Sequence, residues 1–249
     1  MHKPEHCRAW ACAWSDLFPL CPPILPLFPP SPQKFHFPQR YCRCPRRPFH
    51  GRHPHQPNHK TRKYPWKSLS CDDPDFDAAT GNYWRGRVWI PMAYMGTKAL
   101  ETYGMQELAD TLARRVINQQ LRTFKQHTPH TIWETYSPTA DLPSTEHGHQ
   151  VRPDFCGWSA LGPISLFIEN VMGFREVNAL TRTVRWDIKR ENGTHGLRNL
   201  RFGGIVCNLV YDAEKQLIVA STNEAFTLKA NGKSIRLHRG ENVCTLRLH

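Results

Sequence analysis

The distribution of proline restricts where this chain can fold. Positions 1–70 hold 14 of its 21 prolines, and each one removes a backbone donor and disfavours helix at the preceding residue. The same positions carry 12 Lys and Arg against two acids, so 12 − 2 = +10 of the chain's net charge of +12 lies there. We therefore interpret residues 1–72 as a low-complexity, disordered segment rich in Pro, His, Arg and Cys, and expect the fold after it.

The composition of this basic segment also argues against several functions. A basic arm can neutralise phosphates, but this one has no zinc-finger, paired-helix or stacking motif, so we expect a solvated tail and no nucleic-acid partner. The apolar run at 17–30 contains six prolines and is too short for a membrane span or a clear signal peptide. The compartment is not identified, although this absence favours the cytoplasm. Cys42 and Cys44 do not have zinc-ligand spacing, so we expect no metal site and no cofactor.

Three segments after residue 75 show helical periodicity. Arg87–Tyr103 has apolar residues at three- to four-residue steps, with Pro91 in the first turn. Met105–Lys125 is amphipathic and follows Gly104, a natural helix stop. Ser159–Phe174 is apolar on nearly every side, which is typical of a buried helix; if exposed, it would promote self-association. The expected buried stripes are Val88, Met92, Met95, Ala99 and Tyr103 in the first, and Leu108, Leu112, Val116 (or Ala113 and Ile117), Leu121 and Phe124 in the second.

After Gly173 the period of the apolar pattern changes to two, which is typical of half-buried strands. The pairs Asn192-Gly193 and Asn231-Gly232 are turn signals between such segments. We therefore expect a small antiparallel β module at Thr181–His249 that braces the helices. Asn192-Gly193-Thr194 is also a glycosylation sequon, which has meaning only in a secreted chain. The expected strands are Thr183–Ile188, Gly204–Tyr211, Gln216–Ser221, Ala225–Ala230, Lys233–Leu237 and Asn242–Leu248.

A first cluster of aromatic and cationic residues spans positions 83–89, with the sequence YWRGRVW. Flat aromatic faces can cover the C–H surface of a pyranose, and arginine offers planar donors to hydroxyl groups. This composition suits a sugar site. The alternative is an aromatic helix start that is simply buried against its neighbours.

Two further clusters hold candidate carboxylates. Glu134 lies between Trp133 and Tyr136, where partial desolvation would suit a general base, although a surface glutamate has the same pattern. Glu146 is the rival carboxylate. In the third cluster, Asp154 is either catalytic or a loop acceptor, and Cys156 is interpreted as a buried, inert thiol.

The motifs YWRGRVW, WETYSP and PDFCGWSALGPI, in this order and spacing, resemble the C-terminal third of trehalase-like and family-63-type glycoside hydrolases. These families include processing α-glucosidase I and the mannosylglycerate and glucosylglycerate hydrolases. The resemblance covers about Asp75–Trp186. It implies a mainly α chain, with a partial (α/α)6 barrel of about three helices at residues 73–180 followed by the β module at 181–249. It also implies inverting hydrolysis of α-glycosidic bonds.

The same resemblance assigns roles to individual residues. Glu134 matches the family's general base, while trehalases proper have a base nearer the Gly-Trp element, which keeps Glu146 as an alternative. Arg85 matches a substrate contact, and Trp158 matches an aromatic residue of the pocket wall. The expected sugar-binding residues are Tyr83, Trp84, Arg85, Trp89, Trp133, Tyr136 and Trp158.

The expected partner is a carbohydrate substrate: an α-glucoside, an α-mannoside or a related disaccharide. Inversion requires a second carboxyl group about 6.5–9.5 Å from the base. In the family this acid is an Asp upstream of the first motif, where the present chain has only the basic segment and the short Asp72–Asp77 stretch. We therefore expect an incomplete glycosidase that is inactive alone. The alternative is a non-catalytic remnant that binds carbohydrate or a partner protein.

Overall fold

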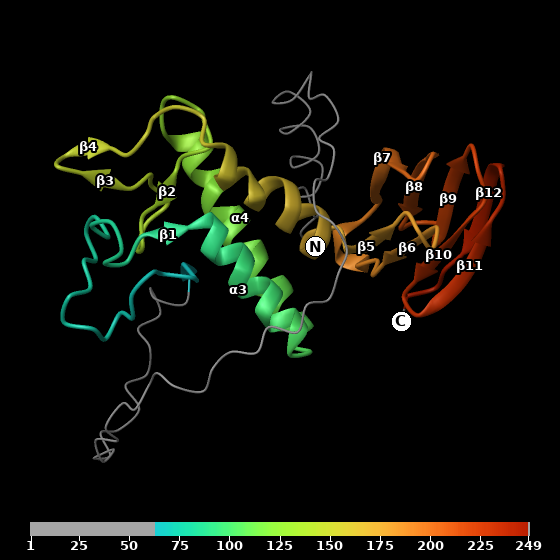
Figure 1. Cartoon of the computed structure of the whole chain (residues 1–249), viewed down its shortest axis with the longest axis horizontal. Coiled ribbons are helices and arrows are strands. Elements are labelled where there is room, and N and C mark those ends of the chain that lie inside the picture. Colours follow the sequence, from blue (N-terminus) through green and yellow to red (C-terminus); the bar gives the residue numbers. More distant parts are fainter. Residues whose placement is uncertain (1–62, 249) are drawn as a thin grey trace, which may run out of the picture. The chain divides into compact units, whose positions relative to one another are not determined.

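The computed structural model describes residues 63–248 (Figure 1). In this part of the chain twelve strands form four sheets, beside two α-helices, one π-helix and two short 3-10 helices. The expectation of a mainly α chain containing a partial (α/α)6 barrel is therefore wrong. The helical pattern supplies only three helical segments, whereas strands continue from residue 174 almost to the end of the described chain. The expectations for residues 1–62, including a disordered tail, lie outside the described residues.

The three helical segments lie close to their expected positions. α3 (Ile90–Thr102) and α4 (Gln106–Gln126) form a hairpin in which Gly104, at a φ of +75°, makes the turn. The third segment is a 3-10 helix, η1 (Gly157–Leu161), followed by a π-helix, η2 (Gly162–Val171). It packs on α4 and α3. In the π-helical geometry, the Met172 amide donates to the Phe167 carbonyl at 2.8 Å, one residue beyond the α-helical partner.

The buried face of α3 differs from the expected stripe. Ile90, Ala93 and Thr97 are fully buried, whereas Met92 and Met95 are 47% and 62% exposed. The helix has apolar side chains on two faces, and small Ala93 and Thr97 allow the closer approach to its neighbours. Periodicity alone does not distinguish the two faces. In α4 the buried face is likewise partly polar; its buried residues are Ala109, Asp110, Ala113, Val116, Ile117, Gln119, Gln120 and Thr123.

Short strands and loops cover one end of these helices. β1 (Val88–Trp89) pairs with β2 (Thr135–Tyr136), and β3 (Thr145–Glu146) pairs with β4 (His149–Gln150), both antiparallel. Residues 63–72, which the sequence placed in the low-complexity segment, are packed in the structure. Tyr64 is 4% exposed, and the Trp66 ring covers Gly96 so closely that a Cβ there would lie 2.3 Å from it.

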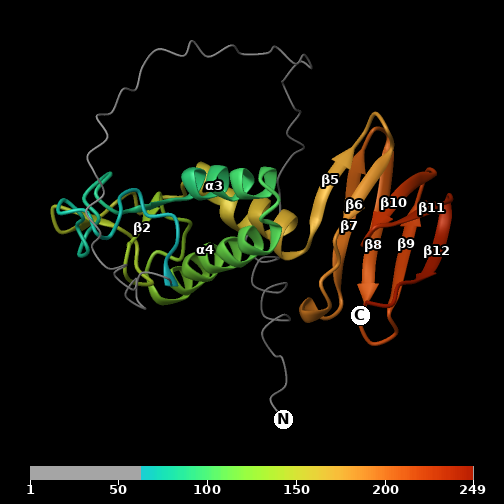
Figure 2. The same ribbon diagram turned by 90° about the horizontal axis from the view of Figure 1, so that it is seen from below.

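The C-terminal part consists of two four-stranded sheets that share one core (Figure 2). The first has the order β11-β10-β6-β5 and the second β12-β9-β8-β7. The strands are β5 (Phe174–Asn178), β6 (Thr183–Trp186), β7 (His195–Phe202), β8 (Ile205–Asp212), β9 (Leu217–Thr222), β10 (Phe226–Ala230), β11 (Lys233–Leu237) and β12 (Gly240–Thr245), with the 3-10 helix η3 (Arg190–Asn192) after β6. All pairs are antiparallel except β6 with β10, which run parallel.

Alternate residues of these strands bury their side chains between the sheets, which is the arrangement of a β-sandwich. Trp186 of β6 stacks on Phe174 of β5 with ring centroids 4.5 Å apart, and Leu209 of β8 and Phe226 of β10 are fully buried in the same cluster. β5 and β7 were not predicted. β5 begins at Phe174, the last residue of the expected third helix, and lies before the expected β module, and β7 carries Arg198 and other polar residues that hide its alternation.

A buried ion cluster joins the sandwich to α4. The Arg175 side chain, on β5, is only 2% exposed and donates to both carboxylate oxygens of Asp110, at 2.9 and 2.7 Å. Arg175 also donates to Asp187 at 3.1 Å, and Asn170 donates to Asp110 at 3.0 Å. Burial alone would raise the pKa of Asp110, but the hydrogen bonds from Arg175 and Asn170 outweigh it and hold the pKa below the ordinary 3.8.

Within residues 63–248, no helix is long and apolar enough to cross a membrane.

Candidate functional site

The pairing of β1 with β2 brings the first two sequence motifs together. Val88 lies opposite Tyr136, and Trp89 lies opposite Thr135. Glu134 immediately precedes Thr135, so the candidate base is held beside the end of the aromatic YWRGRVW segment. The paired residues Trp89 and Thr135 are 46 positions apart in sequence, so the framework of the site depends on a long-range contact. Val88, Trp133 and Tyr136 are fully or almost fully buried in this framework.

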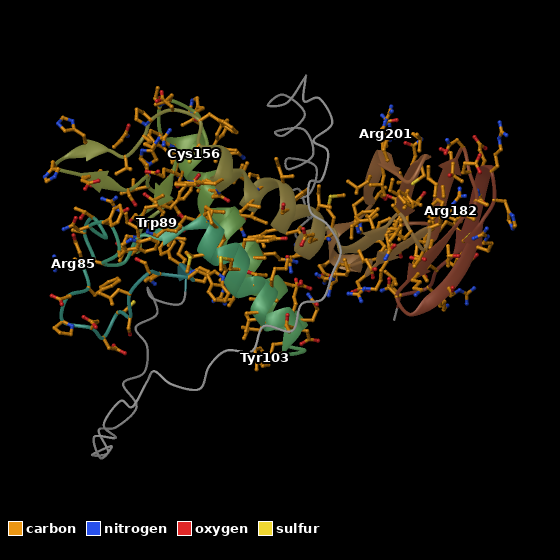
Figure 3. All side chains as sticks on the ribbon, in the orientation of Figure 1. Arg85, Trp89, Tyr103, Cys156, Arg182 and Arg201 are labelled. Atoms are coloured by element: carbon orange, nitrogen blue, oxygen red, sulfur yellow. The ribbon has the colours of Figure 1, made fainter. Side chains whose placement is uncertain are left out.

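Side-chain hydrogen bonds attach the third motif to the same framework. Ser159 Oγ donates to the carbonyl oxygen of Glu134 at 2.8 Å, and the Cys156 amide donates to Ile132 at 2.9 Å. Gln120, from α4, donates to both the Tyr136 hydroxyl at 3.2 Å and the Ser159 carbonyl at 3.0 Å. All three motifs therefore meet near the first turn of α3. Figure 3 shows Arg85, Trp89 and Cys156 in this region, and Tyr103 at the opposite end of α3.

Three aromatic residues of the first motif form a compact group. Trp84 stacks on Trp89 with centroids 4.6 Å apart, and Tyr83 meets both rings edge-on at 5.7 and 5.5 Å. The Trp89 indole donates to the Tyr83 carbonyl at 3.2 Å. Trp89 is buried, but Tyr83 and Trp84 are 54% and 47% exposed, and Trp158 of the third motif is 50% exposed. Open aromatic faces are thus present on two of the motifs.

Glu134 lies within the second motif, and its side chain is 13% exposed. Its neighbours Trp133 and Thr135 are fully buried. Arg152 Nη1 lies 3.9 Å from Glu134 Oε1, and since Arg152 is 58% exposed, this ion pair is weak. The carboxylate is therefore largely shielded and has no strong ion-pair partner among the described residues.

Glu146 has a different environment, on the β3–β4 hairpin. It lies 3.5 Å from Arg87 Nη1, and the Arg87 side chain is 1% exposed. Arg87 also donates to the Thr145 carbonyl at 2.9 Å. A buried guanidinium needs a counter-ion, because an unpaired buried charge is costly. Glu146 therefore neutralises Arg87.

The other predicted residues divide into exposed and buried ones. Arg85 is half exposed, and its Nε donates to the Asp75 carbonyl at 2.7 Å. Asp154 is exposed, and the Cys156 thiol is buried. Trp133 and Tyr136 are buried below the surface, and burial raises the pKa of the Tyr136 hydroxyl well above its ordinary 10.0. This hydroxyl therefore stays protonated and accepts hydrogen bonds from Gln120 and the Trp133 amide.

Sequence reasoning missed the residues that hold the motifs together. Gln120 and Ser159 make the connecting hydrogen bonds, and Arg152 is the cation nearest Glu134. Gln120 gave a weak signal, as a polar residue among the buried positions of α4. Ser159 lies within the third motif but received no role there, and Arg152 gave no signal. In the described part of the chain, no group of three or more His, Cys, Asp or Glu side chains is placed to hold a metal ion.

Comparison with known proteins gives two matches. Residues 51–151 match the family described as the mannosylglycerate hydrolase MGH1-like glycoside hydrolase domain. Over 117 residues the chain is 33% identical to a probable mannosyl-oligosaccharide glucosidase of Schizosaccharomyces pombe, a match that covers 43% of this chain and 13% of that protein. The resemblance to glycoside hydrolases predicted from the three motifs is therefore confirmed. No solved structure matches the chain.

Proposed function

We propose that the three motifs form the base side of a glycoside hydrolase pocket that hydrolyses α-glycosidic bonds with inversion, and that Glu134 is the general base. The observation that carries this proposal is the assembly around Glu134. The β1–β2 pairing brings the first two motifs side by side, and Ser159 of the third motif donates to the backbone carbonyl of Glu134. The glycoside hydrolase match over residues 51–151 supports the reaction class.

The exposed aromatic residues are the proposed sugar contacts. Tyr83, Trp84 and Trp158 are each about half exposed and can stack on the C–H face of a pyranose. Arg85 is also half exposed, and its remaining donors suit sugar hydroxyls. Trp89, together with the buried Trp133 and Tyr136, would support these contacts from behind. The substrate would be an α-glucoside or α-mannoside.

Contacts of the two glutamates favour Glu134 over Glu146 as the base. Glu146 is the counter-ion of the almost fully buried Arg87, so protonating it during turnover would leave that guanidinium unpaired. Glu134 has only the exposed Arg152 nearby, at 3.9 Å. A proton arriving on Glu134 therefore disturbs the surrounding structure less.

In the proposed step, Glu134 accepts a proton from a water molecule as its oxygen attacks the anomeric carbon. The attack occurs on the face opposite the leaving group, the glycosidic bond breaks, and the anomeric configuration inverts. The departing oxygen takes its proton from a general acid. Glu134 is the base in this step, and the general acid is not assigned to any of the described residues.

A substrate with a leaving group that needs no protonation tests the base directly. Purified full-length chain is incubated with α-glucosyl fluoride or α-mannosyl fluoride, and proton NMR follows the anomer of the released sugar. We expect the β-anomer first, and a loss of about 100-fold or more in rate for Glu134→Gln. Glu224→Gln, a change on the sandwich surface, is the matched control. Wild-type rates in the Glu134 variant would remove Glu134 from this role.

A second candidate is sugar binding without catalysis, which the exposed aromatic faces favour by themselves. Isothermal calorimetry with trehalose and mannosylglycerate separates the two functions. The binding module would be established if the wild-type chain binds sugar without turnover. That binding should survive Glu134→Gln but be lost in Trp84→Ala. Met95→Ala is the control, because it also removes an exposed apolar side chain but lies outside the motifs.

A further inference from the structure

A hollow with a volume of ≈ 420 Å³ lies in the C-terminal part of the chain. Three separate segments line it: the stretch after β6, the turn between β10 and β11, and the stretch after β12. None of its lining residues belongs to the three motifs of the candidate glycosidase site. The lining residues are Ile188, Lys189, Glu191, Asn231, Lys233, Leu246, Arg247 and Leu248.

The apolar part of this hollow is held in place by backbone contacts. Ile188 and Leu246 are 2% and 1% exposed and belong to the sandwich core. The Asn231 side chain accepts from the Ile188 amide at 2.8 Å and donates to the Ile188 carbonyl at 3.0 Å. The Leu246 amide donates to the Gln216 carbonyl at 2.9 Å. The hollow is therefore formed before any ligand arrives, and its volume falls in the usual range of small-molecule sites.

The charges around the hollow are predominantly positive, with three cations against one acid. Two of these charges are already paired with α4: Lys189 lies 3.3 Å from Asp110, and Glu191 lies 3.8 Å from Arg114. Lys233 and Arg247 are exposed and have no ion-pair partner among residues 63–248. Two cations without an ion-pair partner in the described part of the chain thus stand beside the partly buried side chain of Leu248.

We propose that this hollow binds a small organic anion. A phosphate or carboxylate group pairs with Lys233 and Arg247, and a short apolar body lies on Leu248, which is only partly buried against the sandwich core. The planar guanidinium of Arg247 can donate two parallel hydrogen bonds to either group. The apolar body gains from contact with this leucine, which is packed against the core but still partly open to solvent.

Four probes separate the two parts of this recognition. Hexyl phosphate and hexanoate carry both an anion and an apolar body, hexanol carries only the body, and inorganic phosphate carries only the anion. Amide shifts of Ile188, Asn231 and Leu246 are followed by NMR in the full chain. We expect hexyl phosphate or hexanoate to bind at least roughly tenfold more tightly than hexanol or inorganic phosphate, since the charge-assisted hydrogen bonds and the apolar contact add.

Variants identify the cations. Lys233→Ala and Arg247→Ala should each weaken the tighter anionic probe roughly tenfold, whereas Arg239→Ala, on the turn between β11 and β12, should not. Thermal unfolding of each variant checks that the sandwich is intact. Equal binding of hexanol and the anionic probes, equal effects of all three variants, or no shifts at these amides would each overturn the proposal.

Discussion

Removing the Asp110 carboxylate should destabilise the folded chain more than removing any exposed charge. In Asp110→Ala, Arg175 stays buried at 2% exposure and loses both hydrogen bonds to Asp110. Breaking a buried ion pair costs about 3 to 5 kcal/mol, because the remaining charge is left without compensation. Asp187 still accepts one hydrogen bond from Arg175 at 3.1 Å, so we expect the lower end, about 3 kcal/mol.

The measurement is guanidinium unfolding followed by circular dichroism, with a thermal scan in parallel. A loss of about 3 kcal/mol corresponds to a fall in Tm of about 6 to 12 °C for a domain of this size. Asp187→Ala is the control, since it removes the half-exposed partner of the same arginine and should cost about 1 kcal/mol. The double variant Asp110→Leu/Arg175→Met replaces the pair by apolar side chains and should recover most of the loss.

The same pair gives a pH dependence whose sign follows from the pKa of Asp110. Its pKa in the folded chain is held below the ordinary value of 3.8, chiefly by Arg175 once burial is overcome. The stabilisation is therefore fully present above pH 3.8 and is lost as the pH falls through the folded pKa. An Asp110→Ala variant that loses no more unfolding free energy than Asp187→Ala would refute this reasoning. So would a double variant whose loss of unfolding free energy equals the sum of the losses of its two single variants.

Three further perturbations test other parts of the fold. Gly162→Ala would place a Cβ 1.8 Å from Oε1 of the buried Gln120, so we expect a loss of about 1 to 3 kcal/mol that a Gln120→Ala background largely removes. Burial lowers the pKa of His195 below 6.5, so the contribution of the neutral ring to stability should be fully present above pH 6.5 and be lost as the pH falls through the folded pKa. Urea unfolding at a series of pH values measures this, and a His195→Phe variant that keeps the same pH dependence would contradict it. The side chain of Asn192, the sequon residue, is 5% exposed and donates to the Val171 carbonyl, so Asn192→Ala should cost about 1 to 3 kcal/mol in chemical unfolding, while an unchanged midpoint would show that this contact contributes little.

Helix and strand positions could be predicted from the sequence where the local pattern was strong. The α4 pattern predicted at Met105–Lys125 appears at Gln106–Gln126, because amphipathic periodicity and the glycine stop are local properties. The strand predicted at Lys233–Leu237 is observed with the same bounds. β5 and β7 were not predicted, because charged side chains interrupt the alternation of both strands and a glycine lies at or near the start of each. Pairing with β6 and β8 makes these segments strands.

The candidate site was only partly predictable for the same reason. The candidate residues could be named from the sequence because the order and spacing of the three motifs resemble those of a known family. Their separation into exposed Trp84 and buried Trp133 could not, since both are tryptophans in similar local contexts. Likewise, the pairing of Glu146 with Arg87 spans 59 residues and became visible only in the structure.

The sequence by itself therefore determined the resemblance to glycoside hydrolases and the approximate positions of the helices and most strands. Tertiary structure alone decided that strands outnumber helices, which face of α3 is buried, and that the β1–β2 pairing joins the first two motifs while Gln120 and Ser159 connect the second to the third. The physical reason is that residue type and periodicity are local, whereas burial, pairing and counter-ion choice depend on which distant segments come into contact.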